Sequence, residues 1–213
     1  GLVCDTGYYL FSVDGLTITN CGTYPIYSGV ELLEFFSDVV ISNPGTPFIG
    51  LGNLYQYRNA TWPDFGLPYR TNGTIMVNDG AVLNISAGTE IVFGNYVQYS
   101  SYPRIMVYGA VNTLGTIDNP VVFRGLSSSN PSTWMGLRIV NPDAVCNLNY
   151  TEILNAGLDE GDTPSEDFCA VYFHNGTVNL SGCRIAISNH NLLKTDGNVS
   201  CSISGCKLDS GNN

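Results

Sequence analysis

Acidic side chains in this sequence come nearest to the spacing of a chemical site. Five of them lie within nine positions: Asp159, Glu160, Asp162, Glu166 and Asp167. Calcium takes about six to eight oxygen ligands, so this segment could supply several of them, although the spacing is not that of an EF-hand. A solvated acidic loop explains the same residues and is the interpretation we prefer. The sequence therefore offers one calcium candidate and no other metal site.

Catalysis on a polysaccharide would need carboxylates aligned on one face, or a basic side chain beside them. Glu90 and Glu152 stand apart from other acidic residues, so we expect them to be surface charges. His174 and His190 lie beside asparagines, in segments that predict turns, and no His and Cys spacing matches a metal site. The sequence therefore predicts no enzyme activity and no cofactor.

Aromatic residues gather in a segment rich in proline. Tyr55, Tyr57, Trp62 and Tyr69 lie within fifteen positions. Such rings can stack on sugar rings, and they can equally pack an irregular loop against the rest of the protein. Packing is the simpler interpretation, and sugar stacking stays open as an alternative.

Cysteines and glycosylation motifs both point to an oxidising, extracellular compartment. None of the seven cysteines forms a C-x-x-C pair, so disulfides with one thiol left over are a better interpretation than a zinc or redox site. Seven asparagines begin N-x-S/T motifs, roughly twice the number expected by chance, and are predicted glycosylation sites. They are Asn59, Asn72, Asn84, Asn149, Asn175, Asn179 and Asn198.

The charge balance excludes several partners. The formal net charge is −10, and only 12% of residues are charged, with the eight basic residues scattered singly. Nucleic acid and anionic membranes are therefore not expected as partners. No apolar run is long enough to span a bilayer, and the first residues lack the pattern of a signal peptide. If the protein is secreted, we expect this sequence to be the mature product or part of a longer precursor.

Short β-branched runs separated by glycine or asparagine turns fill the chain from residue 74 onward. Residues 75–80, 81–86 and 87–94 are three such runs, and residues 105–109 and 121–125 repeat the plan. Strands this short and this regular are typical of a sandwich, a barrel or a solenoid.

A repeated element favours the solenoid. Residues 178–185 resemble residues 201–208, and the two Ser-Gly-Cys elements lie 23 positions apart. One coil of a three-strand β-helix takes a little over twenty residues, so these elements should stack. Residues 16–22 resemble a third copy. A sandwich has no reason to repeat at this period.

These segments resemble the coils of secreted right-handed parallel β-helix proteins, the pectate-lyase-like solenoids. In that family a V-x-x-G-A-x-L-x-I-x-x-G-T-x-I-x-F coil, similar to residues 74–94, precedes a G-T-x-x-N-P-V-x-F coil, similar to residues 105–125. Residues 134–137 and 148–157 continue the likeness, which covers residues 74–213. The resemblance implies an all-β, right-handed parallel β-helix with coils of about 22–30 residues and loop insertions. It implies little about activity, because lyases, adhesins and structural proteins share this architecture. The Asp-Asp, Gly-His-Gly and Arg-x-Lys elements of pectin-degrading members are missing.

The alternation along the predicted strands agrees with a solenoid. Leu83 and Ile85 should point inward, whereas Asn84 and, on a later strand, Asn179 should point to solvent. Cys183 and Cys206, on neighbouring coils, would lie about 4.8 Å apart, within range of a disulfide. Cys4 with Cys21 could close a loop in the first segment, and Cys146 with Cys169 could pair across the loop between them, although sequence alone does not fix the connectivity.

The first third of the chain is less regular. We expect residues 1–42 to form a β segment that resembles coils, in which residues 29–36 form a short helix or another strand. Residues 43–73 contain four prolines and are predicted to be an insertion packed on the β-helix of residues 74–213.

Together these features predict an extracellular structural or adhesive glycoprotein that carries N-glycans. The ends of the chain look like coil material without caps. Either the chain is part of a longer solenoid, or its ends associate head to tail into a filament or surface coat. The alternative is a β-helix protein that binds or cleaves carbohydrate.

Overall fold

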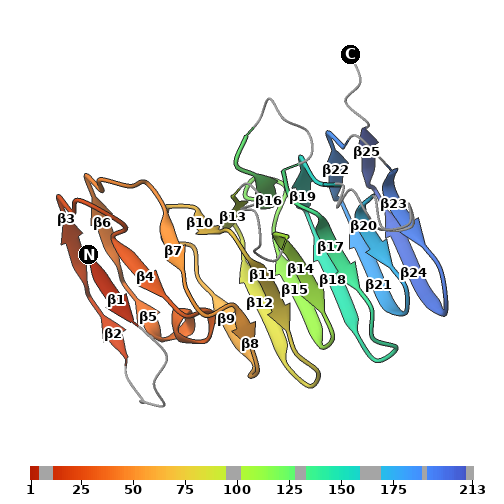
Figure 1. Ribbon diagram of the computed structural model, residues 1–213, viewed down its shortest axis with the longest axis horizontal. Coiled ribbons are helices and arrows are strands. Elements are labelled where there is room, and N and C mark those ends of the chain that lie inside the picture. Colours follow the sequence, from red (N-terminus) through yellow and green to blue (C-terminus); the bar gives the residue numbers. More distant parts are fainter. Residues whose placement is uncertain (5–11, 95–101, 128–132, 159–168, 189–190, 210–213) are drawn as a thin grey trace.

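The computed structural model describes residues 1–4, 12–94, 102–127, 133–158, 169–188 and 191–209. The chain winds into a solenoid whose coils succeed one another from the N-terminal to the C-terminal end (Figure 1). Every strand pairing among the described residues is parallel, and η1 (Val30–Phe35) is the only described helix. The predicted all-β parallel β-helix is therefore confirmed.

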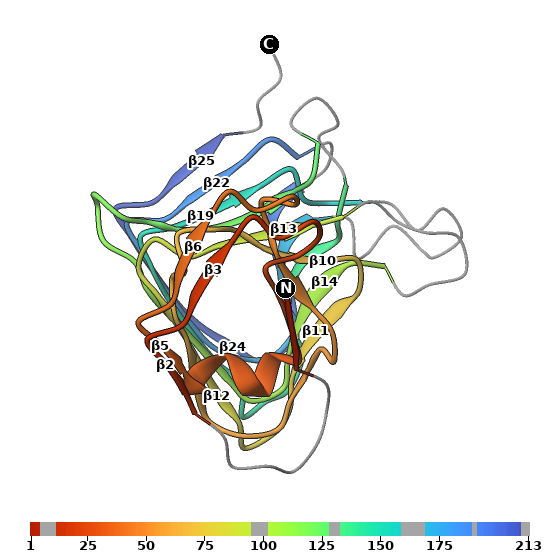
Figure 2. The same cartoon turned by 90° about the vertical axis from the view of Figure 1, so that its left-hand side faces the viewer.

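Three long sheets run along the solenoid and surround its interior (Figure 2). Sheet 1 consists of β1 (Leu2–Cys4), β4 (Ile26–Ser28), β7 (Ile49–Leu51), β10 (Tyr69–Thr71), β13 (Glu90–Phe93), β16 (Val121–Gly125), β19 (Thr151–Leu154), β22 (Arg184–Ala186) and β25 (Lys207–Asp209). Sheet 2 consists of β8 (Tyr55–Gln56), β11 (Thr74–Val77), β14 (Arg104–Val107), β17 (Gly136–Ile139), β20 (Cys169–Phe173) and β23 (Asn191–Thr195). Sheet 3 consists of β9 (Ala60–Trp62), β12 (Val82–Ser86), β15 (Ala110–Leu114), β18 (Val145–Asn149), β21 (Gly176–Ser181) and β24 (Val199–Ser204).

Apolar side chains form continuous columns inside the solenoid. On sheet 1, Ile91, Phe123, Ile153 and Ile185 lie one above another, and all four are fully buried. Each such side chain contributes about 1.5–3 kcal/mol relative to an exposed one. Neighbouring coils bury one another in this way, so the alternation of apolar and polar residues specifies which side of each strand faces inward.

The two Ser-Gly-Cys elements stack as predicted. Gly182 and Gly205 share a φ of 62°, a left-handed conformation that favours glycine. Cys183 lies next to Cys206 on the neighbouring coil, since the backbone N–H of Lys207 donates to the Cys183 carbonyl at 2.8 Å. In the element near the start of the chain, Asn20 takes the place of the glycine with a φ of 53°.

The first two coils contain shorter strands. β2 (Val13–Asp14) pairs with β5 (Phe36–Ser37), and β3 (Thr17–Thr19) pairs with β6 (Val40–Ser42). The described residues among 1–42 are therefore coil-like, and the 3-10 helix η1 settles the choice left open for residues 29–36.

The prediction that residues 43–73 form an insertion is wrong. They form most of a regular coil, because β7, β8, β9 and β10 occupy consecutive positions in the three sheets. Their prolines mislead because Pro47, Pro63 and Pro68 all lie between strands, where a missing N–H breaks no ladder bond.

Candidate functional site

The outer side of sheet 3, here named the amide face, carries only uncharged side chains. The inward side chains of its strands are buried, and the alternate ones point to solvent. The outward residues are Thr61, Val82, Asn84, Ser86, Ala110, Asn112, Leu114, Val145, Asn147, Asn149, Thr177, Asn179, Ser181, Ser200, Ser202 and Ser204.

Four asparagines in register form a ladder along this face. Asn84, Asn112, Asn147 and Asn179 occupy the same position on β12, β15, β18 and β21. Each amide Nδ2 donates to the Oδ1 of the preceding coil, at 2.9 Å for the first step and 2.8 Å for the next two. The Nδ2 of Asn84 donates onward to the Thr61 hydroxyl at 3.5 Å. All four amides therefore point the same way along the solenoid.

The ladder leaves half of the amide hydrogen-bonding capacity at its centre for other partners. A carboxamide has two N–H groups and an oxygen with two lone pairs. Asn112 and Asn147 each use one N–H and one lone pair along the ladder. One donor and one acceptor per coil thus remain, on half-buried side chains.

A shallow groove of about 460 Å³ follows the ladder. Its lining is the asparagine column together with a second column at the ends of the same strands, which contains Leu114, Asn149, Ser181 and Ser204. The groove therefore offers amides and hydroxyls along its length, with apolar contacts from Leu114 and Leu180.

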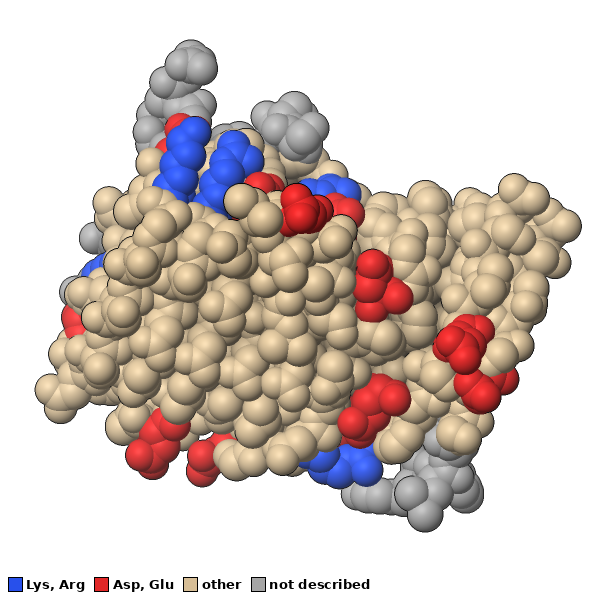
Figure 3. All heavy atoms as spheres, turned by 180° about the vertical axis from the view of Figure 1, so that it is seen from behind, with Lys and Arg blue, Asp and Glu red and all other residues tan. Residues whose placement is uncertain are grey.

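Charged side chains lie around the amide face rather than on it. Figure 3 shows a broad surface without Lys, Arg, Asp or Glu, and the charged residues stand along its margins. On the outer side of sheet 1, Glu90 pairs with Arg124, and Glu152 lies 3.7 Å from Arg184. The two glutamates are surface charges, as predicted, but each has an arginine partner that sequence spacing did not reveal.

The aromatic residues proposed for sugar stacking separate into two groups. Trp62 and Tyr69 are fully buried, with ring centroids 5.7 Å apart, so the prediction that they could stack on sugars is wrong. They point inward because each occupies an inward position on its strand, and burial raises the pKa of Tyr69 well above its ordinary value.

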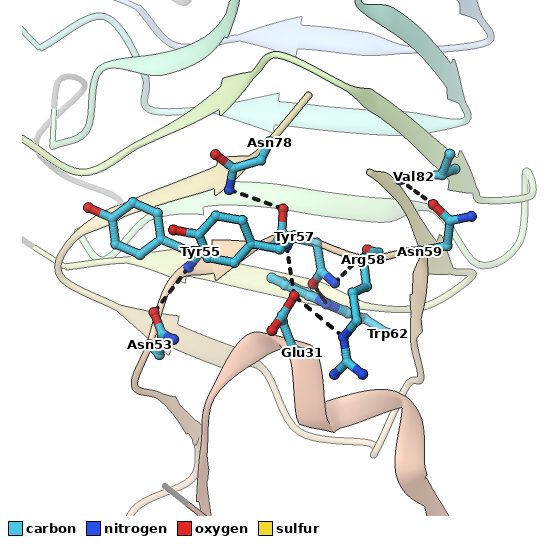
Figure 4. A network of polar contacts seen from close by, with 10 residues as sticks. Glu31, Asn53, Tyr55, Tyr57, Arg58, Asn59, Trp62, Asn78 and Val82 are labelled. Carbon is cyan, nitrogen blue, oxygen red and sulfur yellow. Dashed lines mark hydrogen bonds and ion pairs between the residues drawn. The ribbon is translucent and has the colours of Figure 1, made fainter. Parts of the chain in front are cut away.

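Tyr55 and Tyr57 remain exposed, with 45% and 60% of their surface accessible. Their rings are stacked, with ring centroids 6.0 Å apart and ring planes 12° from parallel (Figure 4). Glu31 on η1 fixes the backbone at Tyr57, because the Tyr57 N–H donates to the Glu31 carboxylate at 2.7 Å. The Arg58 Nε lies 3.7 Å from the same carboxylate. This pair can still offer a ring face to a ligand.

A cluster that the sequence did not reveal lies on the outer side of sheet 2. His174 Nδ1 lies 2.5 Å from Asp196 Oδ1, and the Tyr172 hydroxyl donates to the same carboxylate at 2.9 and 3.0 Å. Lys194 lies 5.3 Å from the centre of the Tyr172 ring. The hydrogen bonds from His174, and then those from Tyr172, lower the pKa of Asp196. A spacing of 22 residues between His174 and Asp196, about one coil, was the available signal.

The acidic residues of the calcium candidate, Asp159, Glu160, Asp162, Glu166 and Asp167, lie outside the described residues, as does His190. Within the described part of the chain, no group of three His, Cys, Asp or Glu side chains could hold a metal ion.

The predicted glycosylation sites lie at two kinds of position. Asn59, Asn72, Asn175 and Asn198 are in turns between sheets. Asn84, Asn149 and Asn179 are on strands of sheet 3 and line the groove. Their outward orientation agrees with the alternation predicted for Asn84 and Asn179.

None of the three predicted cysteine pairs is joined by a disulfide in the structure. Cys183 and Cys206 are nevertheless neighbours, because the Cys183 N–H donates to the Cys206 sulfur at 3.4 Å. Burial raises the pKa of both Cys146 and Cys183. Cys146 belongs to sheet 3 and Cys169 to sheet 2. Cys4 lies opposite Ser28, and Cys21 lies in the turn after β3. Cys201 occupies an inward position on the last strand of sheet 3. The predicted pairings other than Cys183 with Cys206 therefore gain no support from strand register.

Comparison with known proteins identifies the family. The family described as the pectate-lyase-like beta helix domain matches residues 56–164. This range includes β12, β15 and β18, the strands that carry the first three asparagines of the ladder. Searches of the curated proteins and of the solved structures gave no match. The chain belongs to the pectate-lyase-like β-helix domain family.

Proposed function

We propose that the protein is an extracellular adhesive glycoprotein that binds a neutral polysaccharide along the amide face. The asparagine ladder carries this proposal, because it repeats one donor and one acceptor on successive coils beside a groove. A sugar hydroxyl is itself both a donor and an acceptor. A polymer of hydroxyl-bearing units can therefore match a row of amides spaced at about 4.8 Å, the distance between strands.

The absence of charge on this face favours a neutral ligand. The outward side chains of sheet 3 include no cation to pair with a carboxylate or a sulfate group. An ion placed there without a partner would lose hydration with no compensation. The same residues include no group that could transfer a proton near neutral pH, so we propose binding without cleavage.

An extracellular location is supported by the seven glycosylation motifs and seven cysteines. The described part of the chain contains no helix that is long and apolar enough to cross a membrane.

Binding can be tested on protein made without glycosylation, by affinity electrophoresis in gels containing hydroxyethyl cellulose. The Asn112→Ala/Asn147→Ala variant should lose at least about tenfold in affinity, equivalent to 1.4 kcal/mol. Met106→Ala is the matched control, because Met106 lies on the same coil but on the outer side of sheet 2. Equal retardation of the ladder variant and the control would overturn the proposal, as would stronger binding to polygalacturonate.

A second candidate function, end-to-end association, is favoured by the last coil. Ile203 and Leu208 continue inward columns beneath Leu180 and Ile185, yet they are 49% and 52% exposed. A coil from a second copy of the chain, stacked on β24 and β25, would bury them. Negative-stain images should then show filaments that Ile203→Lys abolishes, and a uniformly monomeric wild-type protein would contradict this proposal.

A further inference from the structure

We infer that N-glycans attached to Asn84, Asn149 and Asn179 close the groove of the amide face, so that glycosylation regulates ligand binding there. This inference rests on the proposed function. It starts from the positions of the seven motifs, because these three line the groove and the other four lie in turns.

The central ladder asparagines are not glycosylation motifs. Leu114 follows Asn112 at the second position and Asn149 follows Asn147, where a motif requires Ser or Thr. The ends of the ladder differ, since Ser86 follows Asn84 and Ser181 follows Asn179. Modification would therefore flank the centre of the ladder, and leave its two central amides unmodified.

Attachment changes the hydrogen-bonding capacity of each amide. The anomeric carbon of the sugar leaves a lipid-linked diphosphate donor and forms a C–N bond with Nδ2, which loses one proton. The diphosphate departs with the electron pair of the broken C–O bond. One N–H remains, and the ladder already uses one N–H of Asn84 toward Thr61 and of Asn179 toward Asn147. No amide N–H is then left for a ligand at either end of the ladder.

A glycan is also bulky and would occupy space beside the ladder. Asn149 lies in the second column of the groove, where its Nδ2 donates to the Thr113 carbonyl at 3.3 Å and its side chain is exposed. A glycan there stands next to Asn147 on the same strand. The three sites together flank the two central amides of the ladder from both ends and from one side.

The motifs can be removed with little change to the ladder. Ser86→Ala and Ser181→Ala abolish two motifs and retain Asn84 and Asn179, and Asn149→Gln removes the third while retaining an amide. Asn72→Gln is the matched control, because Asn72 is an exposed motif residue in the turn between β10 and β11.

The test compares affinity for hydroxyethyl cellulose between protein from a glycosylating host and protein made without glycans, with site occupancy mapped by mass spectrometry. Glycosylated wild type should bind at least about tenfold more weakly than the unglycosylated protein. Each variant is compared between the same two hosts, so that any direct effect of Ser181 or Asn149 on binding cancels, and the triple variant should recover most of the loss. Asn72→Gln should recover none.

Three results would overturn the inference: no glycan at any of the three sites, full occupancy with unchanged affinity, or equal recovery by Asn72→Gln. Failure of the proposed function is distinguishable, because the unglycosylated wild type would then not bind the polymer at all.

Discussion

The outer sides of sheets 2 and 3 rest on the same kind of interior but differ in chemistry. Sheet 3 presents one residue type on four successive coils, the asparagines of the ladder. The equivalent column on sheet 2 keeps one residue type over two coils at most, and contains Tyr55, Met76, Met106, Arg138, Tyr172 and Lys194. Inward columns are constrained by packing between coils, whereas outward columns are free to vary. Repetition on an outward column therefore has a reason of its own. The hydrogen bonds of the ladder between coils are one such reason, and the proposed ligand binding would be a second.

The largest effect should come from the interior beneath the amide face. Leu148 is fully buried on β18, directly beside the outward Asn147. Leu148→Ala should lower the free energy of unfolding by about 2–5 kcal/mol, because it removes buried methyl groups and leaves a cavity. Urea denaturation followed by circular dichroism measures this change. A loss as small as that of a surface substitution would show that the coils of sheet 3 are not packed as described.

The second largest effect is a gain in stability at the last coil, where the outer sides of sheets 2 and 3 both end. Oxidation that joins Cys183 to Cys206 would close a loop of 23 positions and should stabilise the fold by about 3 kcal/mol. Peptide mapping without reduction should find this cross-link in protein from an oxidising compartment. A Cys206→Ser variant serves as control and should lose the added stability. Recovery of both residues only as free or differently paired thiols would contradict the prediction.

The sequence predicts the inward half of this molecule better than the outward half. The stacking of residues 178–185 on residues 201–208 follows from their shared Ser-Gly-Cys element and similar flanking residues at a spacing of one coil. The ladder has no such regular signal, because its steps of 28, 35 and 32 residues vary with the turns between strands. Asn84 and Asn179 were predicted to point outward, but which side chains they meet on neighbouring coils depends on the lengths of the turns between strands.

The same limit explains the errors in the first part of the chain. Residues 43–73 have prolines and aromatic residues where later coils have β-branched runs, so periodicity alone could not place them. The strand register, for example Tyr69 opposite Ile91, shows that they form a coil. The His174 and Asp196 cluster was missed because the two residues meet across neighbouring coils.

A smaller effect distinguishes the two faces directly. Asn147→Ala removes one ladder bond on each side of the residue. It should lower the free energy of unfolding by about 1 kcal/mol, because Asn147 is half-buried. Asn112→Ala and Asn147→Ala share a bond, so their effects should not add. The effects of Met106→Ala and Asn147→Ala should add, since the two residues lie on different sheets. If the losses of unfolding free energy for Asn112→Ala and Asn147→Ala were additive, the ladder would not be a cooperative unit.

The smallest effect lies on the outer side of sheet 2 and is a shift in a titration. Hydrogen bonds from His174, and then from Tyr172, stabilise the charged form of Asp196 and lower the pKa of its carboxyl group. A carboxyl pKa that is lower in the folded state contributes stability above the unfolded pKa, and this contribution disappears as the pH falls through the folded pKa. His174→Gln should therefore raise the pKa of Asp196 toward its ordinary value, as read from carboxyl carbon shifts by NMR, and Tyr172→Phe should raise it less. Both substitutions should leave polysaccharide binding unchanged, because the cluster lies on sheet 2. A loss of binding in either variant would mean that the ligand reaches beyond the amide face, and the functional separation of the two faces would then be wrong.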